Sequence, residues 1–321
     1  PDGTAFRGEY RGRERPGFAV RRLALDAALL DAARAAGVEV REGARVTGLV
    51  RESDGVAGVV AEAGSERRAS RARVTVGADG RRSVVARSLG LLREHPTMRR
   101  FAVRGYWEGV EALGDVGEMH VGRGGYCGVA PLSATLANVA FVLDRREMAP
   151  AGGDLEAFYR AALRRRWPRV AERLEGARLT SPPRAIGPLA LECRAVTAPG
   201  AVLVGDAAGF YDPFTGEGIT LALRTAELAA GAISTALARG AAAPAGRLLG
   251  YERERAAATR DKFRFNRLLQ VAVGWPDAAN AVARRLARRP DLADRLVGIA
   301  GDFVPARTAL GPGFLWDLLR A

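Results

Sequence analysis

The stretch Ala201-Val-Leu-Val-Gly205-Asp206-Ala-Ala-Gly-Phe-Tyr-Asp-Pro213-Phe-Thr-Gly216-Glu-Gly218-Ile219-Thr220 decides the interpretation of this chain. Its first apolar residues predict a short buried strand, and the long apolar segment from Gly218 predicts a helix. An acid at the end of a buried strand is costly without a partner, so the pattern predicts that hydroxyl groups of a ligand meet Asp206. Glycines and free N–H groups at the helix start favour a phosphate or another electron-rich group nearby. An ordinary strand-to-helix turn with an acidic cap is the alternative.

A second acid also ends a predicted strand, in Arg73-Val-Thr-Val-Gly-Ala-Asp79-Gly80-Arg-Arg-Ser83-Val-Val-Ala-Arg87. Ser83 is placed to cap the short helix that follows it. The alternative for Asp79 is a plain hairpin or a helix cap. Two acids that each close a strand, on either side of a β-rich middle, support a shared ligand site.

These residues resemble a known family. Gly205-Asp206-Ala-Ala-Gly with Pro213 and Gly216-x-Gly218 is similar to the second FAD motif of flavin monooxygenases related to p-hydroxybenzoate hydroxylase, a motif that geranylgeranyl reductases share. The resemblance implies that Asp206 binds a ribityl hydroxyl of FAD. It also implies that Gly205, Pro213, Gly216, Gly218 and Ile219 lie against the cofactor.

The Asp79-Gly80 motif resembles a second motif of the same family, in which the acid helps to hold FAD and the region approaches the nicotinamide donor. The resemblance implies cofactor contacts for Asp79, Gly80 and Arg87. Arg22, at the start of Arg22-Leu-Ala-Leu-Asp26, is also family-like, which implies a position near the cofactor phosphates. A solvated arginine in the first turn of a helix is an equal alternative for Arg22.

The resemblance implies an α/β (α+β) fold, with an incomplete FAD-binding Rossmann domain of the glutathione-reductase type. We expect FAD-binding segments at 1–95 and 191–240, an inserted antiparallel β substrate domain at 96–190, and a helical region at 241–321. Periodicity and turn residues predict the individual elements. They give helices at 21–36, which Gly37 ends, and at 155–167, which Pro168 ends; strands at 38–40, 46–50, 56–60, 74–76, 101–108, 118–122, 126–131 and 137–144; a hairpin turn at Asp54-Gly55; and helices from 247 onward, interrupted at Pro276 and Pro290.

One family feature is missing. Relatives begin with a Gly-x-Gly-x-x-Gly turn that cradles the pyrophosphate, and the chain contains no such turn. Gly122-Arg-Gly124-Gly125 comes closest, but Cys127 stands at the third glycine position. The sequence therefore predicts a fragment without the first βαβ unit, and it leaves FAD affinity open.

Composition excludes several classes of protein. The net charge is +13 over 321 residues, yet the arginines are scattered without interleaved aromatic residues, which disfavours nucleic-acid binding. An anionic partner such as NADPH, an acyl carrier or an acidic membrane surface stays open. No run of 18 apolar residues predicts a membrane span, and no signal segment begins the chain. Cys127 and Cys193 lack disulfide or CxxC spacing, and His95 and His120 lack metal-ligand spacing, so we expect a cytoplasmic protein without a metal site.

The function expected from the resemblance is FAD-dependent oxidation and reduction. The leading hypothesis is an NAD(P)H-dependent monooxygenase that hydroxylates an aromatic or polyketide-like small molecule. The alternative is an FAD-dependent reductase of isoprenoid double bonds, because Tyr126 and Pro131 keep the spacing of a Tyr-x-Trp-x-Phe-Pro strand in geranylgeranyl reductases. Gly128 and Ala130 replace the bulky residues of that strand, which leaves room for a wider substrate. A truncated fragment without catalysis is the third possibility, and the choice of NADH or NADPH and the oligomeric state stay open.

Overall fold

The computed structural model describes residues 2–10, 17, 19–238 and 245–320 and divides the chain into two compact units. Unit 1 contains Pro1–Ala36, Arg99–Leu189 and Phe265–Ala321, and unit 2 contains Gly37–Met98 and Ala190–Arg264. The units group residues 1–36 and 265–321 with the middle of the chain, whereas the sequence predicted FAD-binding segments at 1–95 and 191–240 and a separate helical region at 241–321. The domain assignment itself stays a prediction.

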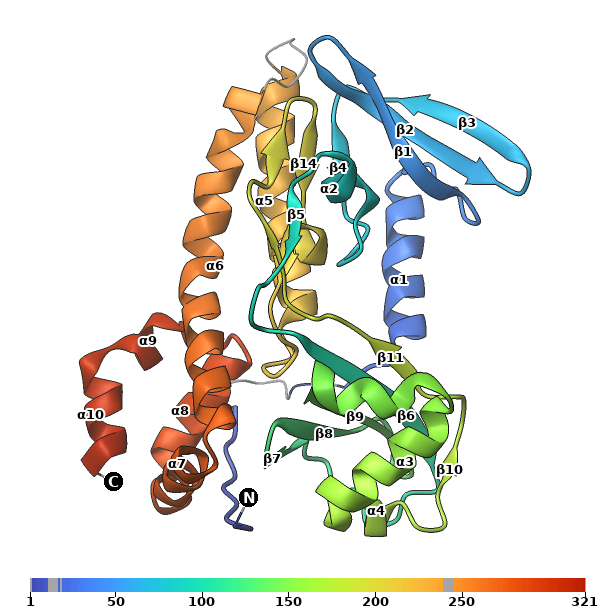
Figure 1. The fold of residues 1–321 in the computed structure, drawn as a ribbon. Coiled ribbons are helices and arrows are strands. Elements are labelled where there is room, and N and C mark those ends of the chain that lie inside the picture. Colours follow the sequence, from blue (N-terminus) through green and yellow to red (C-terminus); the bar gives the residue numbers. More distant parts are fainter. Residues whose placement is uncertain (1, 11–16, 18, 239–244, 321) are drawn as a thin grey trace. The chain divides into compact units, whose positions relative to one another are not determined.

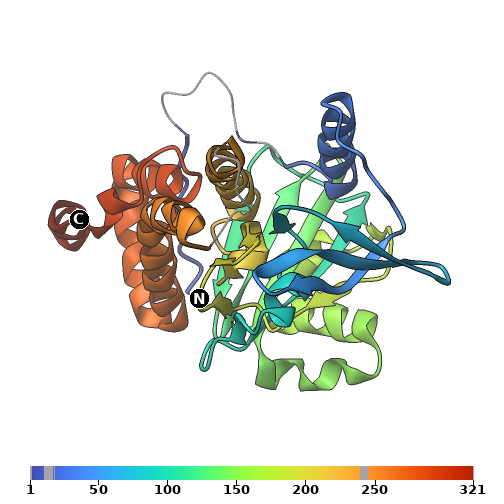
Figure 2. The ribbon, with the colours of Figure 1, turned by 90° about the horizontal axis from the view of Figure 1, so that it is seen from above.

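Unit 2 contains three small sheets. β1 (Arg45–Glu52), β2 (Gly55–Ala63) and β3 (Glu66–Arg71) form an antiparallel sheet (Figure 2). Glu52 pairs with Gly55, which confirms the predicted hairpin, but its turn lies at Ser53–Asp54, one residue before the predicted Asp54-Gly55. The other two sheets contain β5 (Leu92–Glu94), β12 (Leu191–Cys193) and β15 (Gly209–Phe210), and β4 (Thr75–Gly77), β13 (Thr197–Ala198) and β14 (Ala201–Leu203).

The predicted strands at 46–50, 56–60 and 74–76 are confirmed as parts of β1, β2 and β4. The prediction at 38–40 is wrong, because these residues form neither strand nor helix. A β-branched run favours extended backbone, but it makes a strand only where a neighbouring strand supplies hydrogen bonds. The sequence did not predict β3, because its residues are mostly polar or charged and mostly exposed.

β4 and β14 form a parallel pair, and the turn before β14 fixes where that pair begins (Figure 1). Gly200 in this turn accepts a hydrogen bond from the Thr75 N–H at 2.8 Å, and Pro199 accepts one from the Val56 N–H at 2.9 Å. Gly200 has a φ of 71°, and a Cβ atom there would collide with the Val56 carbonyl. Glycine is therefore required at this junction of β2, β4 and β14.

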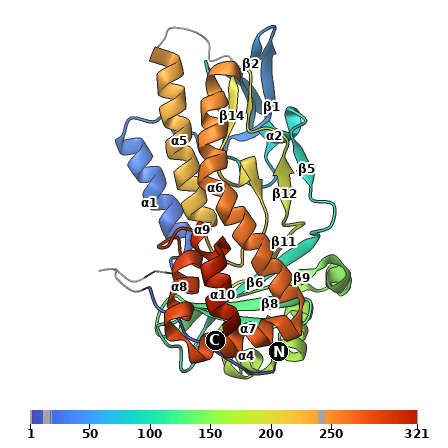
Figure 3. The same cartoon turned by 90° about the vertical axis from the view of Figure 1, so that its left-hand side faces the viewer.

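Long helices pack on the core of unit 2. α5 (Gly218–Ala238) lies beside the first part of α6 (Ala245–Gly274), as Figures 1 and 3 both show. Ala229 and Ala236 of α5 and Tyr251 of α6 join the strand residues Val202 and Leu203 in one buried cluster. Among the described residues, α5 is the one helix with the length and composition of a membrane span, a test that core helices of soluble proteins also pass.

Unit 1 is built on a six-stranded antiparallel sheet. Its main order is β10-β6-β9-β8-β7, and β11 also pairs with β6. The four strands predicted between 101 and 144 are confirmed. The strands are β6 (Arg100–Glu108), β7 (Glu118–Gly122), β8 (Gly125–Pro131), β9 (Leu136–Asp144), β10 (Arg178–Leu179) and β11 (Arg184–Ile186).

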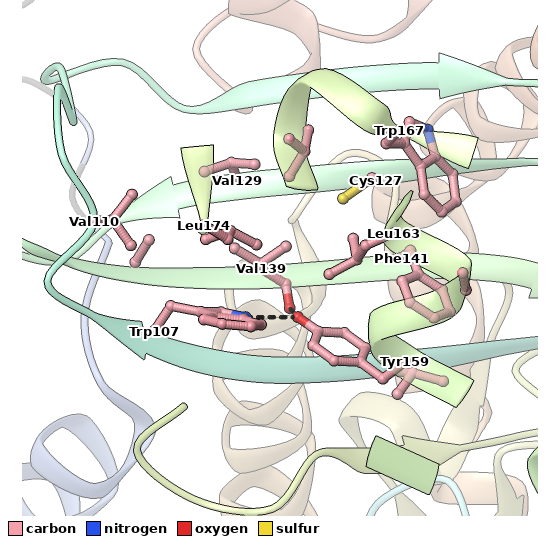
Figure 4. Packing of buried hydrophobic residues seen from close by; sticks show 14 of the residues in the cluster. Trp107, Val110, Cys127, Val129, Val139, Phe141, Tyr159, Leu163, Trp167 and Leu174 are labelled. Atoms are coloured by element: carbon pink, nitrogen blue, oxygen red, sulfur yellow. Dashed lines mark hydrogen bonds between the residues drawn. The ribbon is translucent and has the colours of Figure 1, made fainter. Parts of the chain in front are cut away.

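One face of this sheet packs against α3 (Leu155–Arg166) and α4 (Pro168–Arg173). Figure 4 shows the buried cluster, in which Trp107 Nε1 donates to Tyr159 Oη at 3.1 Å. Tyr159 in turn donates to the Val139 carbonyl at 2.9 Å. Pro168 ends α3 as predicted, but it also opens α4, since proline is tolerated in the first turn of a helix.

The remaining helices largely match the ranges predicted from the sequence. α1 (Arg22–Ala35) ends before Gly37, as expected, but it has no buried residue and Leu23 is 81% exposed. Helices interrupted at Pro276 and Pro290 are confirmed. The shorter helices are α2 (Val84–Ser88), α7 (Pro276–Arg288), α8 (Pro290–Ala300), α9 (Arg307–Leu310) and α10 (Pro312–Arg320), with 3₁₀ turns η1 (Arg145–Gly152) and η2 (Gly205–Ala208).

Candidate flavin site

The two motif acids of unit 2 follow the carboxyl ends of neighbouring parallel strands. Leu203 of β14 pairs with Gly77 of β4, and the Val204 N–H donates to the Gly77 carbonyl at 3.0 Å. Asp79 comes two residues after β4, and Asp206 comes three residues after β14. The carboxyl ends of parallel strands meet at one edge of a sheet, which is where open α/β sheets bind ligands. The topology therefore brings both motifs to the same edge.

Asp206 lies beside the start of α5. A Cβ atom placed on Gly218 would lie 4.0 Å from Asp206 Oδ1 and 3.8 Å from Phe210 Cε2. The first helical hydrogen bond runs from the Leu221 N–H to the Glu217 carbonyl at 3.0 Å, so the earlier N–H groups have no acceptor inside the helix. Asp206 thus offers acceptor oxygens next to a helix end that offers donors and a positive dipole.

Arg81 is buried near Asp206, which the sequence did not predict. Its side chain is 7% exposed, and its Cζ lies 5.9 Å from the centre of the Phe210 ring. Burial lowers the pKa of Arg81, and the negative charge of Asp206 opposes that shift. A buried guanidinium of the Asp79 motif thus lies close enough to Asp206 for the two charges to interact. The only signal in the sequence was its place after Gly80, and the neighbouring Arg82, which is exposed, has the same signal.

Asp79 caps the short helix α2. Its Oδ2 accepts a hydrogen bond from the Val84 N–H at 2.6 Å, and Ser83 Oγ accepts one from the Ala86 N–H at 2.9 Å. The predicted Ser83 cap is therefore confirmed. The helix-cap alternative for Asp79 also holds, and a cofactor contact for Asp79 stays a prediction.

The other residues predicted at the two motifs lie close by in the chain. Gly80 is partly exposed, and exposed Arg87 donates through Nε to the Ser83 carbonyl at 3.2 Å. The Gly205 N–H donates to Thr225 Oγ1 at 2.9 Å, which ties the start of η2 to α5. Their contacts to a cofactor stay predictions.

The loop between η2 and α5 forms a tight turn with an open side. The Gly216 N–H donates to the Pro213 carbonyl at 3.0 Å, and Asp212 Oδ1 accepts from the Phe214 N–H at 3.0 Å. Gly216 has a φ of 73°, and a Cβ atom there would meet nothing within 4 Å. Ile219, in the first turn of α5, is 40% exposed. The turn therefore leaves its glycines and the helix start accessible.

α6 contacts the segment from the end of β14 to η2. Tyr251 donates to the Leu203 carbonyl at 2.7 Å, and Arg255 Nη2 donates to the Ala208 carbonyl at 2.9 Å. Burial raises the pKa of Tyr251 to about 12 and lowers the pKa of Arg255. The ring of Phe263 lies 4.9 Å from that of Tyr211. The sequence predicted helices from residue 247 onward, but it did not predict these contacts.

The predicted residues Arg22, Tyr126 and Pro131 belong to unit 1. Arg22 Nε pairs with Asp26 Oδ1 at 2.9 Å on an exposed turn of α1. Tyr126 is 3% exposed and lies on β8, which ends at Pro131. Gly122 pairs with Gly125 across the β7–β8 hairpin. The Gly122–Gly125 segment, which most resembles a Gly-x-Gly-x-x-Gly turn, is therefore a hairpin turn. The roles of Arg22, Tyr126 and Pro131 stay predictions.

The residues of the unit 2 site fit a flavin dinucleotide. Asp206 supplies acceptors for sugar-like hydroxyls, and the start of α5 and the guanidinium of Arg81 supply donors and positive charge for electron-rich groups. Gly216 leaves space for close approach of a flat ring. Bound there, FAD would supply electron transfer, and the named residues would hold and orient it.

The chain is similar to several known proteins. The digeranylgeranylglycerophospholipid reductase of Methanosarcina mazei is 30% identical over 250 residues, which is 75% of this chain and 59% of that protein. The myxobacterial chondrochloren halogenase has a similar structure, with a TM-score of 0.74 and 25% identity over 96% of this chain and 77% of that chain. The anhydrotetracycline hydroxylase of Streptomyces rimosus matches with a TM-score of 0.68 and 21% identity over 88% of this chain and 56% of that chain, which shows a shared fold.

The chain spans about three fifths of the length of the M. mazei reductase. The family described as "FAD binding domain" matches residues 18–266, a range that includes both acid motifs and α6 as far as Asn266. This match confirms the resemblance that the Asp206 and Asp79 motifs indicated. The chain belongs to the FAD-binding domain family of flavin-dependent oxidoreductases.

Proposed function

We propose that the full-length protein containing this chain is an FAD-dependent monooxygenase that takes electrons from NADH or NADPH and hydroxylates an aromatic or polyketide-like small molecule. FAD is supported by the family match and by the fit of Asp206, Arg81 and the α5 start. The observation that carries the substrate class is the face of the unit 1 sheet opposite α3 and α4.

That face is defined by strand alternation. Val103, Val129 and Val139 belong to the buried cluster against α3 and α4. Because side chains alternate along a strand, the residues next to these valines in β6, β8 and β9 point to the other face. On this second face Tyr106 and Ala130 each pair with Asn138, and Gly128 and Arg104 each pair with Ala140. We call the set of Arg104, Tyr106, Gly128, Ala130, Asn138 and Ala140 the substrate face.

The substrate face combines small residues with polar groups. Gly128, Ala130 and Ala140 place no bulky side chain on this face, and a Cβ atom on Gly128 would meet Met119 Cε at 3.7 Å, an ordinary contact distance. Arg104 Cζ lies 4.8 Å from the centre of the Tyr106 ring, within range of a cation–π contact. Asn138 Oδ1 is buried and has no hydrogen-bond partner among the described residues. Such an acceptor suits a substrate hydroxyl, and a ring with polar substituents fits this face better than a bare hydrocarbon chain.

In the proposed reaction NAD(P)H, a proton, O2 and the substrate give NAD(P)+, water and the hydroxylated product. FAD supplies the electron transfer when it is bound. Asp206 holds cofactor hydroxyls, and Arg81 balances negative charge. No nucleophilic side chain is needed.

A second candidate is reduction of a carbon–carbon double bond in an isoprenoid substrate. It is favoured by the 30% identity to the M. mazei reductase and by the spacing of Tyr126 and Pro131. Gly128 and Ala130 argue against a close copy of the reductase strand, because they leave its bulky positions empty.

The mass of the product separates the two candidates. Purified full-length protein is loaded with FAD and given NADH or NADPH, and flavin absorbance and oxygen uptake are followed with a panel of phenolic, polyketide and prenyl compounds. Monooxygenation gives a product with one added oxygen and substrate-dependent oxygen uptake. A gain of two hydrogens without oxygen uptake supports the reductase, and a protein that takes up no FAD fits the non-catalytic alternative and refutes both enzymes.

A further inference from the structure

The single lysine of the chain is buried against the loop that precedes α5. Lys262 is 6% exposed and forms an ion pair with Glu217, which is also 6% exposed. Lysine is rarely buried in proteins, and a buried charge is tolerated when an opposite charge meets it. The other 48 of the 49 basic residues are arginines. A lysine at this one place thus coincides with a buried carboxylate inside the Gly216-Glu217-Gly218 motif.

Lys262 continues a row of side chains on one face of α6. Tyr251, Arg255 and Lys262 are spaced by four and seven residues, which puts them on the same side of a helix. They meet successive points of the flavin segment, namely the Leu203 carbonyl, the Ala208 carbonyl and the Glu217 carboxylate. α6 therefore contacts the segment from the end of β14 to the start of α5.

Glu217 links this row directly to the start of α5. Its backbone carbonyl accepts the first helical hydrogen bond, from the Leu221 N–H at 3.0 Å, while its side chain pairs with Lys262. The same residue is thus fixed at both its main chain and its side chain. Gly216 and Gly218 have no side chains, so within Gly216-Glu217-Gly218 it is the side chain of Glu217 that ties the turn to α6.

We propose that Glu217 and Lys262 are a positioning pair for the flavin, in which the buried ion pair holds the Gly216–Gly218 turn and the free N–H groups of α5 in the orientation that binds the cofactor. The proposal rests on the proposed function in so far as the site binds FAD. It predicts that flavin affinity and the flavin absorption spectrum depend on both charges, although neither side chain supplies electrons or protons to the reaction.

The test compares full-length wild-type protein with Lys262→Met, Glu217→Gln and the double variant Lys262→Met/Glu217→Gln. Arg264→Met is the matched control. Arg264 lies two residues after Lys262 and its side chain is 65% exposed, so this variant removes a positive charge from the surface and not from the buried pair. Three quantities are measured: the unfolding midpoint without FAD, the Kd for FAD by fluorescence, and the absorption spectrum of the bound flavin.

We expect each single variant to lower the unfolding midpoint, since each leaves one buried charge without its partner. The double variant removes both charges and should regain most of that stability. It should still bind FAD at least tenfold more weakly than wild type and shift the flavin spectrum, whereas Arg264→Met should change neither. A double variant that binds FAD with wild-type affinity and spectrum overturns the proposal and leaves the pair with a purely structural role.

Chemical labelling of Lys262 gives an independent measurement that needs no variant. Acetic anhydride is applied to the wild-type protein, and the acetylation rate of Lys262 is followed by mass spectrometry of the peptide that contains it. Saturating FAD should slow the reaction at least tenfold, because a cofactor held by the turn disfavours the transient opening that exposes Lys262, and equal rates with and without FAD contradict the proposal. Wild-type protein that binds no FAD refutes the proposed function as well, whereas FAD binding with an unaffected double variant refutes the positioning pair alone.

Discussion

Substituting Gly218 by alanine separates the needs of the fold from those of the cofactor. Gly218 is the first residue of α5, and its φ lies outside the region that alanine avoids. An added Cβ would lie 3.8 Å from Phe210 Cε2 and 4.0 Å from Asp206 Oδ1, which are ordinary contact distances. The folded chain therefore has room for the methyl group, and that group would stand beside the carboxylate that we expect to meet the flavin.

The two effects have opposite signs. Replacing glycine by alanine at a compatible position stabilises a protein by about 0.4–1 kcal/mol, because the unfolded chain loses conformational freedom. A methyl group pressed into a filled contact costs about 1–3 kcal/mol. That loss corresponds to an FAD Kd raised by roughly five- to 150-fold, since about 1.4 kcal/mol is a factor of ten. We expect a more stable protein without FAD and a weaker complex with it.

The assay measures unfolding by urea without FAD and FAD affinity by quenching of flavin fluorescence. Gly231→Ala is the control, because Gly231 lies within the same helix and a Cβ there would meet nothing within 4 Å. It should stabilise the protein by about 1 kcal/mol and leave the Kd unchanged. Equal FAD affinity for Gly218→Ala and wild type would refute the placement of the cofactor against the start of α5.

Two further predictions concern stability. Tyr159→Phe should lower the unfolding free energy by about 1–3 kcal/mol in urea denaturation, because it leaves the buried Trp107 N–H without its acceptor and removes a donor to Val139; no loss would contradict this hydrogen-bond chain. The pKa of Glu192 is lowered, since burial raises it but hydrogen bonds from Arg93 and Tyr211 outweigh burial. This stabilisation is present above the unfolded-state pKa and is lost as pH falls through the folded one, so Arg93→Met should destabilise the protein at about pH 7, and its difference from wild type should be smaller at about pH 3. Unfolding curves at the two pH values check the sign, and a gap that widens in acid would contradict it.

The sequence predicted the part of the site that local pattern determines. A strand that ends in an acid, as at Asp206, has a short-range signature, and the glycines of the following turn add to it. Parallel pairing of β4 and β14 then brought Asp79 to the same edge, which two similar motifs in one chain already suggested. The cofactor contacts of these residues are still predictions, but the position of their strands is not.

The missed features depend on long-range packing. Arg81 and Arg82 are the same residue type side by side, and only the folded chain buries one against Phe210 and exposes the other. Lys262 stood out in the composition as a single lysine, but nothing near it in sequence indicates Glu217, which is 45 residues away. The sequence did not predict that polar side chains of α6 are buried. Whether a charge is buried depends on its partner in the fold, and periodicity does not reveal that partner.

The Pro199–Gly200 turn affects how a mutational scan of this protein should be interpreted. Any side chain at Gly200 would collide with the Val56 carbonyl and displace the strand that leads to Asp206. Variants at this position should therefore lose flavin, although the turn precedes that strand and supplies no group to the cofactor. Intolerance at Gly200 would resemble the signature of a binding residue, and a scan that records expression level together with flavin content is needed to tell a scaffold position from a ligand contact.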